Sequence, residues 1–220
     1  MFALITDGSI AKYYSGNRGV TIGDIQYPKA IFTLWTKSER EAIGIYEVEM
    51  DYSNRKDEKY YTNTNVSYSF GSGKVTGSYG SATAKAHADT LYIQDDVNAD
   101  VYPEGHSRAG ERVNDFSVGD VKIEGLKTIK IRNIKQQAAS ILAQTDWYIV
   151  RKADANTAVP SAITNHRAAV RTKCAEMETA ITNASNTAAI ETLYTAVNTA
   201  DEGDPVVMER PLGELPTLEV

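Results

Sequence analysis

YYTNTNVSYSFGSGKVTGSY, residues 60–79, is the stretch that decides the fold of the first half of the chain. Val66, Tyr68 and Phe70 alternate with small polar residues, so a strand here has one apolar and one wet face. Gly-Ser-Gly at 71–73 then predicts the turn of a β-hairpin, because glycine adopts the positive φ angles that tight turns require. KVTGSY follows as the second strand. We therefore predict antiparallel β structure in this half.

The same glycines allow a second interpretation, because Gly73 and Lys74 resemble the end of a phosphate-binding loop. Such a loop needs a further glycine where this chain has Tyr68, and a serine or threonine where it has Val75. A hairpin turn accounts for the same residues without these departures. No cofactor is therefore expected at this position.

Further strand signals lie upstream. Residues 2–5 and 10–14 flank the sequence TDGS at 6–9, in which Asp-Gly favours a tight hairpin turn. Residues 44–52 alternate between two unlike faces, which is typical of a strand. Between these segments AIFTLW is apolar enough for a strand, whereas TKSEREA at 36–42 offers a threonine N-cap and early acidic residues and predicts a short helix.

The composition changes near Gly125, from Tyr, Thr, Ser, Gly and Asn to Ala, Ile, Lys and Glu at helical spacing. We predict an α+β fold: a β-rich domain of hairpins and a small antiparallel sheet at 1–124, a helical hairpin or three-helix module at 125–201, and an extended C-terminal tail at 202–220. Residues 94–120 are acidic and weakly patterned, and are interpreted as a surface loop or polar connector.

Three helices are predicted in the second half. The first ends near Thr145, the second begins at Pro160 and Ser161 after a break of about fifteen residues, and the third is short. Because each has a single apolar stripe, the helices must pack on one another or on a neighbouring chain. The stripes consist of Ile131, Ile134, Ala138, Ile141 and Leu142; of Ile163, Val170, Cys174, Met177 and Ile181; and of Ile190, Leu193, Tyr194 and Val197.

Charge and hydropathy exclude several classes of partner. The net charge is −6 with both signs interspersed, so we expect no nucleic-acid partner. No apolar stretch approaches the roughly 20 residues that span a bilayer, and the N-terminus lacks the features of a secretion signal. These features predict a soluble protein made in the cytoplasm, without membrane insertion. The single cysteine, Cys174, falls on an apolar stripe and is interpreted as a core residue.

Candidate metal-binding and catalytic residues are few. Asp96, Asn98 and Asp100 resemble the start of a calcium-binding loop. Such a loop requires a glycine where this chain has Val101, and a final acidic ligand where it has Ser107. His87, His106 and His166 lie far apart without a second ligand at zinc-like spacing. We therefore expect no metal, no cofactor and no catalytic residue. An enzyme such as a glycan depolymerase stays open, since two of the 29 acidic residues would suffice as a carboxylate pair.

Two stretches resemble bacteriophage tail proteins. AASILAQTDWYIVRK at 138–152, followed by Pro160 and HRAAVR at 166–171, is similar to the C-terminal module of fibre-associated and tail-assembly-chaperone proteins, in which a helix, a Thr/Ser-Asp-Trp step and a loop precede an Arg-Ala-rich helix. MFALITDGSIAKYY at 1–14 and IQYP at 25–28 resemble the beginning of the same proteins. The tyrosine-rich hairpin and the long tail exceed a minimal chaperone, and YIVRK after the tryptophan departs from the commonest versions.

The resemblance implies a virion component of the tail, made in the host cytoplasm, that contacts other tail or fibre proteins and forms a homo-oligomer in a symmetric assembly without catalysis. An assembly chaperone that leaves the finished particle is the alternative. Asp146, Trp147 and Tyr148, with Tyr68 and Phe70 on the tyrosine-rich hairpin, are the candidate interface residues or structural anchors.

Trp147 has two interpretations. A core position at a helix–helix corner is preferred, and its replacement by alanine would then cost about 3 kcal/mol through the cavity left behind. An anchor in an interface is the other interpretation. Thr145 or Asp146 is expected to cap the turn after the first long helix.

Overall fold

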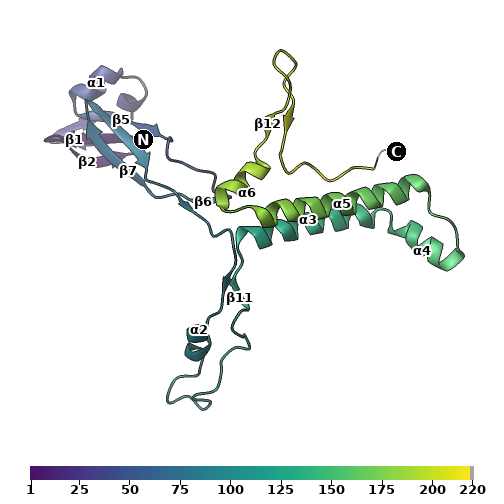
Figure 1. Ribbon diagram of the computed structural model, residues 1–220. Helices are drawn as coiled ribbons and strands as arrows, with labels where there is room; N and C mark the ends of the chain where they lie inside the picture. The colour runs from purple at the N-terminus through teal and green to yellow at the C-terminus, as the bar shows by residue number, and fades with distance from the viewer. Residues whose placement is uncertain (219–220) are drawn as a thin grey trace. The chain divides into compact units, whose positions relative to one another are not determined.

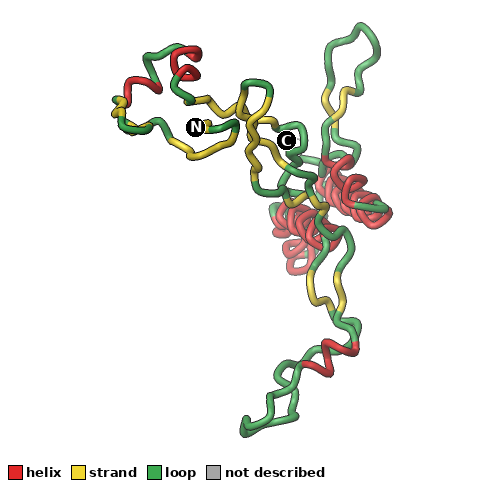
Figure 2. Tube along the Cα trace, turned by 90° about the vertical axis from the view of Figure 1, so that its left-hand side faces the viewer, coloured by secondary structure: helices red, strands yellow, loops and turns green. Residues whose placement is uncertain are grey.

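The computed structural model describes residues 1–218 and divides the chain into two compact units, Met1–Thr83 and Ala84–Val220. The first is built mainly from strands, and the second contains the long helices (Figures 1 and 2). This is the α+β fold that the sequence predicts. The division at Ala84 differs from the change of composition near Gly125, since the intervening segment belongs to the helical unit.

A curled five-stranded sheet forms the first unit. Its strand order is β2-β1-β5-β8-β7, with β5 and β8 parallel and the other neighbours antiparallel. The strands are β1, Phe2–Thr6; β2, Ser9–Tyr14; β5, Ile45–Asp51; β7, Val66–Gly71; and β8, Lys74–Tyr79. Both predicted hairpins, β1–β2 and β7–β8, are confirmed. The two-stranded sheet of β6, Tyr61–Thr62, and β9, Thr83–Ala84, is separate.

The turns of the two hairpins have the same backbone form. Asp7 and Gly8 have φ angles of 51° and 72°, and Ser72 and Gly73 have the same pair of values. Two consecutive positive φ angles match the twist of the flanking strands. The Gly-Ser-Gly stretch is therefore a hairpin turn.

The segment between β2 and β5 folds over one face of the sheet. It contains β3, Val20–Ile22; β4, Ile25–Tyr27; a 3-10 helix, Lys29–Phe32; and α1, Lys37–Ala42. AIFTLW thus lies partly in the 3-10 helix and forms no strand. α1 begins with a capping box between Thr36 and Glu39, as the threonine N-cap predicted. The buried core between this segment and the sheet consists of Phe2, Val20, Ile31, Phe32 and Ile45.

Two antiparallel helices, α3, Leu126–Ala143, and α5, Ser161–Asn183, lie side by side in the second unit (Figure 1). Both were predicted, and α6, Thr187–Tyr194, is the expected third helix. The predicted break instead contains a further helix, α4, Asp146–Ala155, none of whose residues is buried. Its large apolar residues form one continuous run, WYIV at 147–150, which the spacing used for the other helices does not identify. We refer to α3, α4, α5 and α6 as the stem.

The core of the stem matches the predicted apolar stripes. Its buried members are Ile134 and Ala138 from α3, and Val170, Cys174, Met177 and Ile181 from α5, together with Leu212. Burial raises the pKa of the Cys174 thiol, whose Sγ donates a hydrogen bond to Glu178. Cys174 is therefore a core residue, as predicted.

The C-terminal stretch was predicted to be an extended tail, and it returns to the stem of its own chain. Its strand β13, Met208–Glu209, pairs with β12, Val197–Asn198. Leu212 is 4% exposed, and its N–H donates to the Leu193 carbonyl over 3.0 Å. The third predicted stripe was wrong at its end, because Val197 lies in β12 and is exposed. The last two residues of the predicted tail lie outside the described residues.

Residues 90–123, named the arm from here on, form an excursion before α3. The arm starts and ends in the paired strands β10, Thr90–Leu91, and β11, Val121–Ile123, and contains a short helix α2, Gln94–Ala99. The polar connector predicted at 94–120 therefore has secondary structure of its own. Within residues 1–218 no helix combines the length and the apolar character that a membrane crossing requires.

Candidate interaction surface

The base of the arm is fixed to the first turn of α3. The first N–H groups of a helix have no partner within the helix and need acceptors from elsewhere. The Gly125 N–H donates to the Asp89 carboxylate over 2.6 Å, and the Thr128 hydroxyl donates to its other oxygen over 2.8 Å. Asp89 thus caps α3 from 36 residues upstream, where its negative charge also favours the positive end of the helix.

Backbone carbonyls complete this cap. The N–H groups of Leu126 and Lys127 donate to the carbonyls of Ala86 and His87 over 2.9 and 3.0 Å. A Cβ on Gly125 would lie 2.3 Å from the Ala88 carbonyl carbon, so only glycine permits this approach. We call residues 85–89 and 125–128 the clamp. It holds both ends of the arm at one place on the stem.

Aromatic and cationic side chains order the arm above the clamp. Tyr92 and Phe116 stack with ring centroids 3.8 Å apart. Lys122 lies over the Tyr92 ring, and Arg112 lies over the Phe116 ring. Such cation–π contacts stabilise exposed sites by about 0.5–1 kcal/mol each. The arm therefore has internal contacts of its own.

The outer part of the arm repeats this pattern. Tyr102 stacks on His106 with centroids 4.3 Å apart, and Arg108 lies over Tyr102. The Asn114 side chain donates to the Asp100 carboxylate over 2.8 Å. Asp96 pairs with Lys122, which lowers the pKa of the Asp96 carboxyl. Two of the carboxylates that resemble calcium ligands, Asp96 and Asp100, are therefore bound by protein groups.

Seven large aliphatic side chains of the arm face solvent. Between 38% and 60% of the surface of each is exposed. The internal contacts of the arm are made by its aromatic rings, and no other part of the described chain buries these aliphatic side chains. They are Leu91, Ile93, Val101, Val113, Val118, Val121 and Ile123.

A second exposed surface lies on α4 at the opposite end of the stem. Trp147 is 51% exposed, and its ring lies 3.9 Å from that of Tyr148. The guanidinium of Arg151 lies 4.7 Å from the Trp147 ring centroid. The core position that we preferred for Trp147 is therefore wrong. A tryptophan at an outward corner has no neighbouring helix to cover it, and its stability contribution is correspondingly small.

Arg167 fixes the corner that carries these rings. Its buried guanidinium donates to the Leu142 carbonyl over 2.6 Å and to the Thr145 hydroxyl over 2.7 Å, and lies 2.8 Å from the Asp146 carboxylate. The Thr145 hydroxyl donates in turn to the Leu142 carbonyl. Thr145 is the N-cap residue of α4 but makes no side-chain cap hydrogen bond there, so the expected cap is not formed, and its hydroxyl instead serves a carbonyl in the last turn of α3. The sequence suggested no such role for Arg167, because its partners lie more than 20 residues away.

Tyr68 and Phe70, the other candidate residues, lie on β7 in the first unit. The Tyr68 ring lies 5.1 Å from Tyr13 on β2, and the Phe70 ring lies 4.9 Å from Tyr46 on β5. These rings fill the inner side of the curled sheet and hold its two edge strands near each other. They are anchors within the unit, and they lie on a different unit from Asp146, Trp147 and Tyr148.

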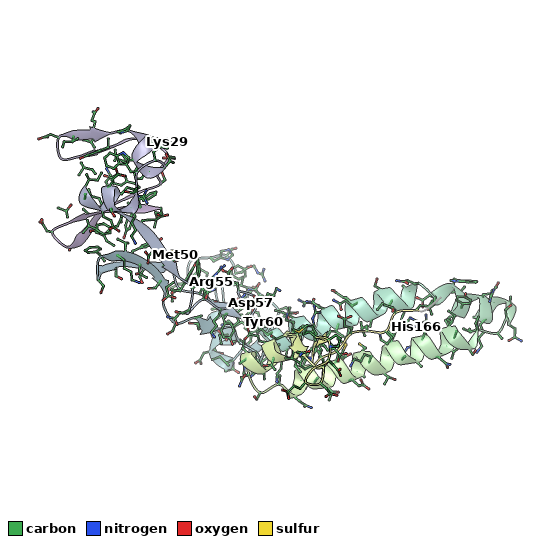
Figure 3. The ribbon with its side chains drawn as sticks, turned by 90° about the horizontal axis from the view of Figure 1, so that it is seen from above. Lys29, Met50, Arg55, Asp57, Tyr60 and His166 are labelled. Atoms are coloured by element: carbon green, nitrogen blue, oxygen red, sulfur yellow. The ribbon has the colours of Figure 1, made fainter. Side chains whose placement is uncertain are left out.

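The residues considered for metal binding and catalysis are dispersed. No group of three His, Cys, Asp or Glu side chains in residues 1–218 is arranged to hold a metal ion. His87 is in the clamp, His106 is in the arm, and His166 is on α5 (Figure 3). The pKa values of Glu39 and Asp51 are lowered by hydrogen bonds from the backbone of Thr36 and Ser53, which belong to a helix cap and a turn.

The basic side chains of the stem mostly have local partners. Lys135 pairs with Glu178 across the two long helices over 3.0 Å, and Lys173 pairs with Glu176. A cleft of about 590 Å³ lies beside them, between α3 and the C-terminal stretch, and includes Lys130, Arg210 and Glu214. Its mixed charges indicate no particular ligand.

Comparisons of the chain with known family models, with curated proteins and with solved structures gave no match. The arm and the α4 corner are therefore defined by their own geometry alone.

Proposed function

We propose that this protein is a structural component of a bacteriophage tail, of the fibre, fibre-attachment or baseplate-adaptor kind, that acts through protein–protein contacts. The class of assembly rests on the resemblance of residues 138–152 and 1–14 to tail proteins. The mode of action rests on the exposed apolar side chains of the second unit.

That exposure is the observation that carries the proposal. Of the nineteen exposed large apolar side chains in residues 1–218, fourteen belong to the second unit, and seven of these lie on the arm. Soluble monomers rarely expose contiguous apolar patches of more than a few hundred Å². The accessible surface is 14547 Å², whereas two separate compact proteins of these lengths would expose about 12,000 Å². Elongated elements such as the arm have more surface than a compact fold, and this excess supports the proposal that part of it contacts a partner.

Quantitative mass spectrometry of purified phage particles tests this proposal. Particles released from cells that produce the chain should contain it at a fixed ratio to the other tail proteins, and washing with 1 M salt should not remove it. A chain that is abundant in the cell lysate but missing from purified particles would contradict a structural role and favour the assembly chaperone.

A matched pair of variants connects the test to the surface. Trp147→Ala removes the largest exposed ring of α4, and we expect it to lower incorporation into particles severalfold. Ala168→Glu, at an exposed position of α5, is the control and should be incorporated normally. Equal incorporation of both variants would show that α4 is not a contact surface.

A further inference from the structure

Charge is divided unevenly within the second unit. The arm has seven acidic and three basic side chains, a net charge of −4. α3 has four basic side chains and no acidic one. The arm is thus an acidic element with exposed aliphatic side chains, and α3 is a basic element.

α3 also has a small apolar site at the exposed edge of its stripe, where Ile131 is only partly covered by the stem core. A shallow depression of about 460 Å³ lies on this helix, with Ile131 and Ala139 on its floor and Arg132 and Lys135 at its rim. Arg132 pairs with Glu124 and Lys135 with Glu178. These exposed pairs are worth about 0–1 kcal/mol each, so they exchange readily for carboxylates of a partner.

The arm offers a matching surface. Leu91 and Val121 are opposite each other in the β10–β11 pairing, so their side chains lie on the same face of this two-stranded ribbon. They are 46% and 47% exposed. An isolated two-stranded ribbon is only marginally stable in water, and a partner on its apolar face stabilises it. The side-chain carboxylates of Asp95 and Glu104 in the arm make no hydrogen bond or ion pair with other described residues. They are therefore free to pair with basic side chains of a partner.

We infer that the arm of one copy of this chain docks on the outer face of α3 of a second copy. The inference rests on the proposed structural function and specifies how that function assembles. Aliphatic side chains of the arm cover Ile131 and Ala139, and its carboxylates approach Arg132 and Lys135. Two such α3 faces do not pack on each other, because Arg132 and Lys135 on each would repel those on the other. The contact is therefore between unlike surfaces, and each chain has one copy of both, so the assembly is a ring or a filament.

Variants with a defect on one surface test this arrangement. Leu91→Ser with Val121→Ser is the arm variant, and Ala139→Glu is the stem variant. All three positions are exposed, so both variants should fold, which circular dichroism checks. The matched controls are Val206→Ser in the loop between β12 and β13 and Ala168→Glu on α5, which are also exposed.

Sedimentation velocity of the purified full chain gives the readout. The unaltered chain and both controls should associate beyond a dimer at micromolar concentration, with an association at least tenfold weaker in 0.5 M salt than in 0.05 M salt. Each defective variant alone should stay monomeric. An equal mixture of the two should form dimers and nothing larger, because one intact arm meets one intact stem.

Three results would overturn the inference: a monomeric unaltered chain at 100 µM, association of either defective variant like the unaltered chain, or a mixture that stays monomeric. None of these results decides whether the chain belongs to a phage tail. Conversely, absence of the chain from purified particles would remove the tail function while leaving the docking of arm on stem intact.

Discussion

The curled sheet of residues 1–83 and the stem with its arm differ in where their apolar side chains lie. The sheet is covered on one face by the segment between β2 and β5 and is filled on the other by its own aromatic rings. It exposes five large apolar side chains, whereas the other unit exposes fourteen. The sheet thus buries most of its apolar side chains within its own unit, whereas the stem and its arm leave more of theirs in solvent, where the proposed contacts would form.

The largest effects should come from removing core methyl groups. Ile45 in the sheet and Ile181 in the stem are both fully buried. Ile45→Ala and Ile181→Ala should each lower the free energy of unfolding of their own unit by about 3 kcal/mol. Hydrogen exchange measured by mass spectrometry should show lost protection in one unit only for each variant. Lost protection in both units would mean that the two unfold together.

Two glycines provide the next comparison. A Cβ on Gly125 would meet the Ala88 backbone at 2.3 Å, whereas one on Gly77 would meet the Met50 sulfur at 2.7 Å and the Tyr68 ring at 2.8 Å. We expect Gly125→Ala to cost about 3 kcal/mol and Gly77→Ala about 1–2 kcal/mol, because side chains move aside more easily than backbone. Chemical denaturation measures both. Gly71→Ala is the control, since nothing lies within 4 Å of its added Cβ. A larger loss for Gly77→Ala than for Gly125→Ala would mean that the clamp gives way more easily than the sheet.

A smaller loss is expected at the corner between α3 and α4. Arg167→Ala leaves the Leu142 carbonyl and the Thr145 hydroxyl without the guanidinium donor, which should cost about 2 kcal/mol. The exposed Asp146 adds little to this figure, because water screens its charge. Thermal unfolding of the stem is the measurement, with exposed Arg171→Ala as the control. Equal melting temperatures for the two variants would show that Arg167 does not hold the corner.

The smallest effect on stability is expected for Trp147→Ala. Because this side chain is half-exposed, its loss should change the free energy of unfolding by less than about 1 kcal/mol. A loss near 3 kcal/mol in urea denaturation would restore the core position inferred from the sequence. The combination of a small stability change with reduced incorporation into particles is the signature of a contact residue.

Elements with a regular apolar pattern or specific turn residues were predictable from the sequence. The stripe of α5 predicted every buried residue of that helix except Arg167, and Asp7-Gly8 predicted the first hairpin. α4 was missed because it is short and its large apolar residues form one run at 147–150, which does not show the i, i+3, i+4 spacing of a buried stripe. Leu212 was missed because it joins the stem core from an irregular segment.

The candidate surface was less predictable than the fold. Residue type alone identified the candidates Asp146, Trp147 and Tyr148. Whether Trp147 lies in the core or faces solvent depends on which elements pack around it, and the sequence does not show this. The clamp depends on Asp89 and Gly125, whose hydrogen bond joins positions 36 residues apart. No local pattern links them, because capping at this separation is a property of the folded chain.

The clamp also determines how this protein tolerates changes in length. Residues 85–89 and 125–128 are joined by hydrogen bonds to each other. The backbone therefore leaves the stem and returns to it at adjacent points, and this does not depend on the residues between them. Loop closure there depends only weakly on the number of intervening residues. Residues between these two points can therefore be added or removed without changing the helices of the stem.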